Sequence, residues 1–326
     1  MDDLAQLEKT LTDRLLRWDR LSSWVHGICV VTFDLELGQV VETIWPKHSV
    51  LTEGDKTNVC YLAFPDSNSG VMGDSQYHFR IRLSPGSGGG ASTINNKPEN
   101  ASSSASKAEV VAEDKEKSHP SHLHTSKIHS EFNRRCPTAL AFDPAYLFGF
   151  SFFRQVKDSS IRRGYFQKSV ILLSKLPLIS LFSQAVSVIA QRYFAQGEAA
   201  LEAACYDIDR WPLPIPGHTL ELGLLGCAFQ VMLPSLTTRS VESGCETVTI
   251  SPTEGESYMN LIQSSSTDVD IFTCLLPVVE HMHALWELVL TAEPLVVMAA
   301  TPTLCASTVQ FLTTVIYPLS YCADYR

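Results

Sequence analysis

The sequence lacks the short motifs with which many enzymes bind nucleotides or hydrolyse bonds. It contains no G-x-x-x-x-G-K-[ST], G-x-G-x-x-G, G-x-S-x-G or H-E-x-x-H segment. The glycine-rich stretch at 84–90 lies outside any predicted strand–helix pair, so it does not indicate a phosphate site. We therefore expect no covalent chemistry, no catalytic residue and no cofactor.

Positive charge is also scarce. The chain has 25 Lys and Arg against 35 Asp and Glu, for a formal net charge of -10, and this argues against nucleic-acid binding. The nine cysteines form no C-x-x-C pair, and the first ten residues are acidic and polar rather than typical of a secretory or transit peptide. We expect reduced thiols and a cytoplasmic location.

Four histidines cluster near the middle of the chain, but the residues expected around a metal are missing. No cysteine or carboxylate stands among them at a fixed spacing on a predicted element, so a chance cluster is favoured and no metal site is expected. These histidines are His119, His122, His124 and His129.

Charge disappears altogether over residues 294–323, a length sufficient to span a bilayer. Pro302 and Pro318 interrupt this stretch, and polar Thr, Ser and Gln are frequent in it. We predict a buried parallel strand at 295–300 followed by a helix at 303–317, and no transmembrane span.

The clearest pattern that is present lies at 147–176. Two runs of alternating side chains flank Asp158, Ser159 and Ser160, residues that favour turns because their side chains bond nearby backbone. Period-2 alternation with aromatic and β-branched residues on both sides of a turn predicts a β-hairpin.

This hairpin concentrates positive charge against the acidic background of the chain. Two interpretations are open: a solvated rim of the hairpin, or a docking patch for an acidic partner. The basic residues, our candidate partner-binding patch, are Arg154, Lys157, Arg162, Arg163 and Lys168.

The stretch FRQVKDSSIRRGYFQKSVILLSKLPL resembles the matching stretch of DENN-domain proteins, most closely the sixth DENN subfamily. Residues 24–48, 59–82 and 281–302 show the same resemblance, in the family's order. The resemblance implies a guanine nucleotide exchange factor for a Rab GTPase, acting in vesicle trafficking at recycling endosomes with at most peripheral membrane association. The alternative is a longin-like adaptor that binds a trafficking partner without nucleotide exchange.

The order of predicted elements in residues 1–211 indicates an antiparallel sheet with helices, an α+β fold, and the resemblance implies a longin-like upstream module. We expect a disordered insertion at 84–136, because its polar composition cannot bury a core. The predicted helices lie at 3–21, from 52 to 62, at 177–193 and at 198–209, and the predicted strands at 28–34, 40–46 and 77–83.

The proline-rich segment 212–218 is predicted as a linker. Residues 219–326 then form the start of the central DENN module, with strands and helices alternating as in an α/β unit and a mobile loop at 235–267. In the family this module continues well past the position equivalent to Arg326. We therefore expect an incomplete module, impaired exchange activity and an exposed apolar surface.

Overall fold

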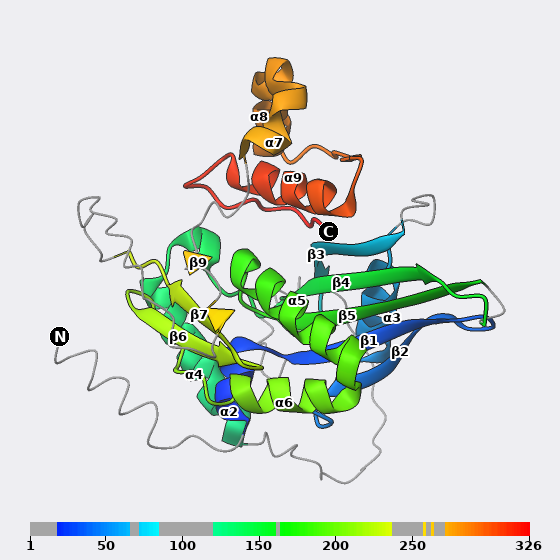
Figure 1. The fold of residues 1–326 in the computed structure, drawn as a ribbon. Helices are drawn as coiled ribbons and strands as arrows, with labels where there is room; N and C mark the ends of the chain where they lie inside the picture. Colours follow the sequence, from blue (N-terminus) through cyan, green and yellow to red (C-terminus); the bar gives the residue numbers. More distant parts are fainter. Residues whose placement is uncertain are drawn as a thin grey trace, which may run out of the picture.

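The computed structural model describes residues 18–65, 72–84, 120–160, 164–236, 257–258, 262–263 and 271–326. Its centre is a five-stranded antiparallel sheet in the order β2-β1-β5-β4-β3 (Figure 1). The strands are β1 (Gly27–Asp34), β2 (Gly38–Trp45), β3 (Gly73–Arg82), β4 (Tyr146–Lys157) and β5 (Tyr165–Ser174). Helices cover both faces, and the predicted α+β organisation is confirmed.

The predicted hairpin at 147–176 is confirmed as β4 and β5, which form the middle of the sheet together with β1. Phe150 of β4 pairs with Leu172 of β5, and both are fully buried. Gly149 faces the other side, where a Cβ atom would lie 2.3 Å from the Phe79 ring. Only glycine leaves room for that aromatic ring across the strand pair.

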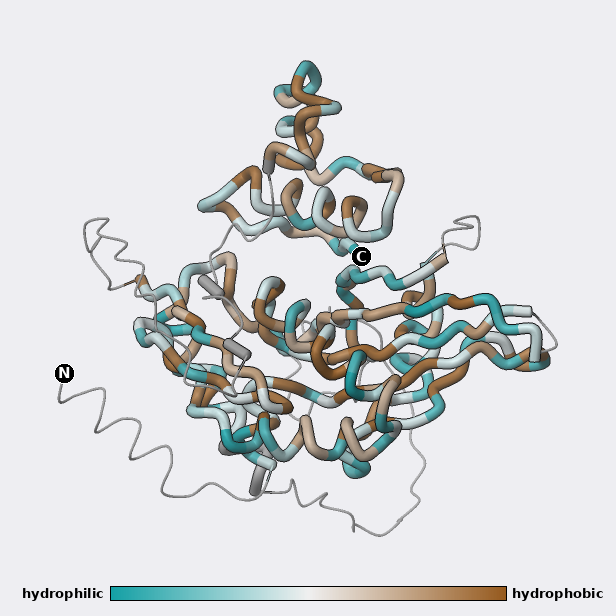
Figure 2. Tube along the Cα trace, in the orientation of Figure 1, coloured by the Kyte–Doolittle hydropathy of each residue, from teal (hydrophilic) through white to brown (hydrophobic). Residues whose placement is uncertain are grey.

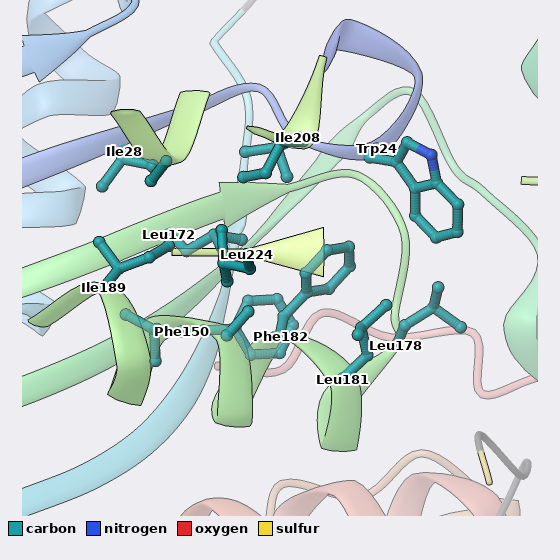
Figure 3. Close-up of a cluster of buried hydrophobic side chains, with 14 of the residues drawn as sticks. Trp24, Ile28, Phe150, Leu172, Leu178, Leu181, Phe182, Ile189, Ile208 and Leu224 are labelled. Atoms are coloured by element: carbon teal, nitrogen blue, oxygen red, sulfur yellow. The ribbon is translucent and has the colours of Figure 1, made fainter. Parts of the chain in front are cut away.

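One helix covers one face of the sheet and two helices cover the other. α3 (Glu53–Leu62) begins at Thr52, whose hydroxyl oxygen accepts the Asp55 N–H at 3.1 Å. On the opposite face, α5 (Ile179–Gln196) and α6 (Glu198–Ile208) bury Phe182 and Ile208 against Phe150 and its neighbours (Figure 3). These helices confirm the predicted ones at 52–62, 177–193 and 198–209.

The predicted insertion at 84–136 is wrong in its last part. Residues Pro120–Arg135 form helix α4, followed by the short η1 (Thr138–Leu140). Ile128, Phe132 and Cys136 are buried, since their spacing of four puts them on one side of the helix. The apolar side of α4 was obscured by the polar composition around it.

His129 of the histidine cluster belongs to this packed helix. It is buried, its Nε2 donates to the Ser23 carbonyl at 2.9 Å, and its ring stacks on Phe142 at 4.3 Å. The partners of its ring are thus backbone and an aromatic side chain. Ser23 lies in α2 (Asp19–Trp24), and most of the predicted helix 3–21 falls outside the described residues.

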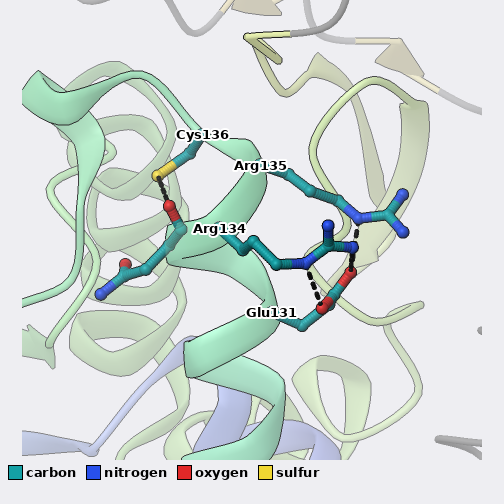
Figure 4. A network of polar contacts seen from close by, with 5 residues as sticks. Glu131, Arg134, Arg135 and Cys136 are labelled. Atoms are coloured by element: carbon teal, nitrogen blue, oxygen red, sulfur yellow. Dashed lines mark hydrogen bonds and ion pairs between the residues drawn. The ribbon is translucent and has the colours of Figure 1, made fainter.

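At its C-terminal end, α4 carries a charged cluster. Glu131 accepts hydrogen bonds from Arg134 at 2.6 Å and from Arg135 at 2.5 Å (Figure 4). Because of these bonds, first of all that of Arg134, the pKa of Glu131 lies below its usual value. Glu131 therefore keeps its negative charge near the C-terminal end of α4. At the same end, the Leu236 N–H donates a hydrogen bond to the Arg135 carbonyl at 2.8 Å.

A second hairpin, β6 (Thr219–Leu224) and β7 (Cys227–Met232), packs on the side of the sheet covered by α5 and α6. Its inward side chains share that buried cluster, and the preceding segment 212–218 buries Leu213 and Ile215. The predicted loop 235–267 contains the two-residue strands β8 (Ser257–Tyr258) and β9 (Ile262–Gln263), both paired with β7, so the loop prediction is wrong there. The division into two modules stays a prediction.

Residues 271–326 contain α7 (Ile271–Leu275), η2 (Leu276–His281), α8 (Met282–Leu290) and α9 (Pro302–Thr314). The helix predicted at 303–317 is confirmed, but the strand at 295–300 is wrong. This segment has no regular secondary structure and pairs with none of the described strands, and Val296 and Met298 are 89% and 90% exposed. A strand requires a neighbour for its backbone groups, and the apolar run alone does not provide one.

Several large apolar side chains of this region face solvent, as expected, and Figure 2 shows brown, hydrophobic segments along α7 and α8. In the described part of the chain, no helix combines the length and hydrophobicity that a membrane crossing requires. The most exposed of these side chains are Phe272, Leu276, Val296, Met298 and Leu319.

Candidate partner-binding surface

Three of the basic residues predicted as a patch, Arg154, Lys157 and Lys168, lie where β4 and β5 approach their connecting turn. We call residues 154–160 and 164–168 the hairpin arm. Its register places Arg154 opposite Lys168 and Lys157 opposite Tyr165. In the turn, the Asp158 carboxylate accepts hydrogen bonds from the N–H and the hydroxyl of Ser160, at 2.9 and 2.6 Å, which lower the pKa of Asp158.

Arg154 is held by a carboxylate on the neighbouring strand. Its Nε and Nη2 donate to the two oxygens of Asp74 at 2.7 and 2.6 Å, a bidentate pair that raises the pKa of Arg154. The guanidinium carbon also lies 4.3 Å from the ring centroid of Phe194, at the end of α5. Arg154 is therefore fixed within the sheet rather than extended toward solvent.

Lys168 is neutralised by Glu42, which lies on β2 at the opposite edge of the sheet from β3. Its Nζ lies 2.7 Å from a Glu42 oxygen and 3.3 Å from the Tyr193 hydroxyl, and its side chain is only 16% exposed. Burial alone would lower the pKa of Lys168, but Glu42 and Tyr193 outweigh that effect and raise it. Two like charges directly opposite each other are thereby tolerated, because each has its own counterion.

Glu42 reaches Lys168 because of an irregularity in β2. The register shifts between Val30 and Val31, which pair with Thr43 and Val41, so Glu42 is an extra residue on its strand. Such a bulge re-aims a side chain and increases the local twist. Neither this bulge nor Asp74 was predicted as part of the site, and β2 shows no local pattern that signals a counterion.

Lys157 is the patch residue that stays exposed at the end of the arm, while Arg162 and Arg163 lie outside the described residues. Apolar side chains accompany it, with Val156 47% and Tyr165 39% exposed. Leu37 in the β1–β2 turn is 77% exposed, and since Thr32 pairs with Lys168, this turn lies at the same end of the sheet. The arm thus combines apolar and basic groups.

Potential metal ligands do not gather at any one place in the described regions. No cluster of three His, Cys, Asp or Glu there could hold a metal ion, and the described cysteines are free thiols. Burial raises the pKa of Cys136 to about 11 and of Cys205 to about 12, so neither provides a thiolate nucleophile near neutral pH. What the arrangement offers is a surface for contact.

A comparison with known families identifies this surface as part of a recognised region. The family model described as "Transport protein Avl9" matches residues 25–203. The chain belongs to the Avl9 family. The matched Avl9 region contains the five-stranded sheet, α5 and the whole hairpin arm, and it ends within α6, before β6.

Relatives of this Avl9-family chain are DENND6 proteins, which confirms the resemblance to the sixth DENN subfamily. Protein DENND6A of Gallus gallus is 43% identical over 312 residues, 96% of this chain and 47% of that protein. Protein DENND6B of Homo sapiens is 40% identical over 314 residues, 95% and 46% of the two chains. The Protein DENND6 homolog of Dictyostelium discoideum is 30% identical over 335 residues, 93% and 39%. The chain spans about half the length of these relatives.

Proposed function

We propose that this protein takes part in guanine nucleotide exchange on a Rab GTPase in endosomal recycling, with the hairpin arm as a contact surface. Support comes from membership of a family described by the words "Transport protein" and from relatives named for the DENN domain. The observation that carries the proposal is the arm itself, which presents exposed apolar and basic side chains.

Exchange requires no bond-making chemistry. An exchange factor binds the GTPase more tightly when the nucleotide has left, and by linkage it weakens nucleotide binding by the same factor. Such a function needs complementary surface rather than a nucleophile. By the strand register, the exposed Tyr165 and Lys157 share one face of the arm and the exposed Val156 lies on the other, so both faces offer apolar area and one of them also carries charge.

We also propose the module assignment that the resemblance implied. One helix on one face of the sheet and two on the other, with strand order β2-β1-β5-β4-β3, are consistent with a longin-like first module. Residues 219–326 would begin the central DENN module, and the GTPase would lie between the two. The partner, and not a membrane-spanning helix, would bring the protein to endosomes.

The test is release of labelled GDP from a panel of purified Rab proteins, with this chain and with a full-length DENND6 relative. The expected result is faster release from one Rab or a few, reduced by Val156→Asp and Tyr165→Asp together. A matched control is Val50→Asp, since Val50 is equally apolar, 75% exposed and far from the arm in the chain. Release unaffected by either chain across the panel would rule out exchange.

The alternative function, a longin-like adaptor, makes a different prediction in the same experiment. An adaptor would bind a Rab or another trafficking protein through the arm without accelerating GDP release. Binding measured by titration, with release rates unchanged even for the full-length relative, would favour the adaptor over the exchange factor.

A further inference from the structure

Residues 271–326 form a helical unit, which we call the C-terminal unit, with a buried cluster of its own. Val289, Phe311, Leu312 and Ile316 make up this cluster, and none of them belongs to the clusters on the two faces of the sheet. Figure 1 shows the unit beside β3, with α7 and α8 projecting away from the sheet. Its internal packing therefore does not depend on contact with the sheet.

The C-terminal unit meets the rest of the protein along β3, the outermost strand of the sheet. α9 lies against this strand, and the Thr303 hydroxyl donates to the Gln76 carbonyl. An edge strand presents unpaired backbone groups, and a helix laid along it shields them from other chains. A polar side chain and a backbone carbonyl thus make this hydrogen bond between the two parts.

A second contact lies at the end of the chain, where Arg80 sits against two aromatic rings. Its guanidinium carbon is 3.4 Å from the ring centroid of Tyr146 and 4.2 Å from that of Tyr325. Asp324 accepts hydrogen bonds from the Tyr146 hydroxyl and from Arg82 Nη1, the latter at 3.1 Å. We call these five side chains the Arg80 clamp.

The ion pair of the Arg80 clamp is in contact with water. The side chains of Arg82 and Asp324 are 68% and 52% exposed, so water and salt compete with this pair, while Arg80 and the two tyrosines are half-buried. Two separately packed bodies joined in part by an exposed ion pair are expected to move relative to one another.

We propose that the C-terminal unit leaves the edge of the sheet as one folded body, and that the Arg80 clamp determines how often it is docked. Undocking uncovers the backbone of β3 and changes the position of the exposed Val296 and Met298 relative to the hairpin arm. The movement stands on the packing and contacts described above and does not require the proposed exchange activity.

Hydrogen–deuterium exchange of the whole chain tests this, because it reports on β3 and α9 separately. The variants are Asp324→Asn, which removes the ion pair with Arg82, and Arg80→Leu, which removes the cation from between the two rings. Glu36→Gln is the control. Like Asp324→Asn it removes one negative charge, but from an exposed side chain in a turn that makes no contact with the clamp.

We expect exchange at residues 73–82 to be roughly threefold faster in each clamp variant, as for loss of one exposed contact, with α9 as protected as in the natural protein. Raising NaCl from about 0.05 to about 0.5 M should act in the same direction as Asp324→Asn. Faster exchange of β3 and α9 together would mean local unfolding and overturn the proposal. So would exchange at β3 that neither variant nor salt alters.

Discussion

Asp209, just after α6, accepts a hydrogen bond from the backbone N–H of Leu21, 188 positions earlier in the chain, at 3.1 Å. The other oxygen of this carboxylate accepts the Trp18 N–H at 3.3 Å. Asp209 therefore serves as the N-terminal cap of α2 from a distant part of the chain. It connects the first described helix to the end of the last helix that covers the sheet.

This cap should contribute measurably to stability. Asp209→Ala leaves two backbone N–H groups without their acceptor, so we expect the free energy of unfolding to fall by roughly 1–2 kcal/mol. Urea unfolding followed by circular dichroism measures the change. Glu202→Gln, at an exposed position of α6, is the control, and a loss as small as that of the control would show that the cap is unimportant.

Acid should destabilise the protein through His129. Burial lowers the pKa of His129 to about 4, while the unfolded chain has the usual value of 6.5. Below pH 6.5 the unfolded state takes up the proton first, so stability falls progressively until the folded pKa is reached. Between pH 7.5 and pH 5 this one group should remove roughly 2 kcal/mol.

His129→Gln should remove this share of the acid dependence, because glutamine takes up no proton in this range, while His78, whose pKa burial also lowers to about 4, retains its own share. The relevant quantity is the difference in unfolding free energy between pH 7.5 and pH 5, compared within each variant. His281→Gln, at an exposed position, should leave the dependence as it is. An unchanged slope in His129→Gln would assign the acid sensitivity to other groups.

The segment between β3 and β4 should divide into a dispensable and an essential part. Deleting residues 86–118 should cost little, because its composition is polar and loop-closure entropy depends weakly on length. Phe132→Ala in α4 should lower the unfolding free energy by about 3–5 kcal/mol, since Phe132 is only 1% exposed. The melting temperatures of the deletion variant and of Phe132→Ala test this division. Equal melting temperatures for the two would contradict the role given to α4.

Fragments of different length should show whether the β6–β7 hairpin completes the core. Leu222 and Phe229 of β6 and β7 share the buried cluster of α5 and α6. A fragment of residues 1–236 should therefore unfold cooperatively and at a higher temperature than one of residues 1–211. Calorimetry of both is the measurement, and a more stable shorter fragment would place the boundary at 212–218, as the proline-rich composition suggested.

Arg162 and Arg163, which lie in sequence between the two parts of the arm, should act on the rate of encounter with an acidic partner. Arg162→Glu with Arg163→Glu should slow association with the Rab found in the exchange assay and reduce its salt dependence. The control is Lys127→Glu with Arg210→Glu, an equal change of charge at exposed positions elsewhere. Association at low salt that resists the first pair of changes would favour the solvated-rim interpretation.

Patterns that repeat over a few residues were sufficient for the elements that carry the fold. Alternation along Phe148, Phe150 and Phe152 predicts β4, and the apolar side of residues 177–193 predicts α5, because one buried face imposes a period of 2 or 3.6 on the sequence. The same local regularity misled at 295–300, where an apolar run predicts a strand that finds no partner. It also hid α4, whose few buried residues lie within polar sequence.

The hairpin, the helices that cover the sheet and the resemblance to the DENN family could be read from the sequence, since each depends on residues close together in the chain. Which charges of the candidate patch are neutralised became evident only from the folded chain. Arg154 and Lys168 find Asp74 and Glu42 at separations of 80 and 126 positions, and the second pairing also needs a bulge in β2. No local pattern encodes such pairs, because their energy arises only after strands distant in sequence have come together.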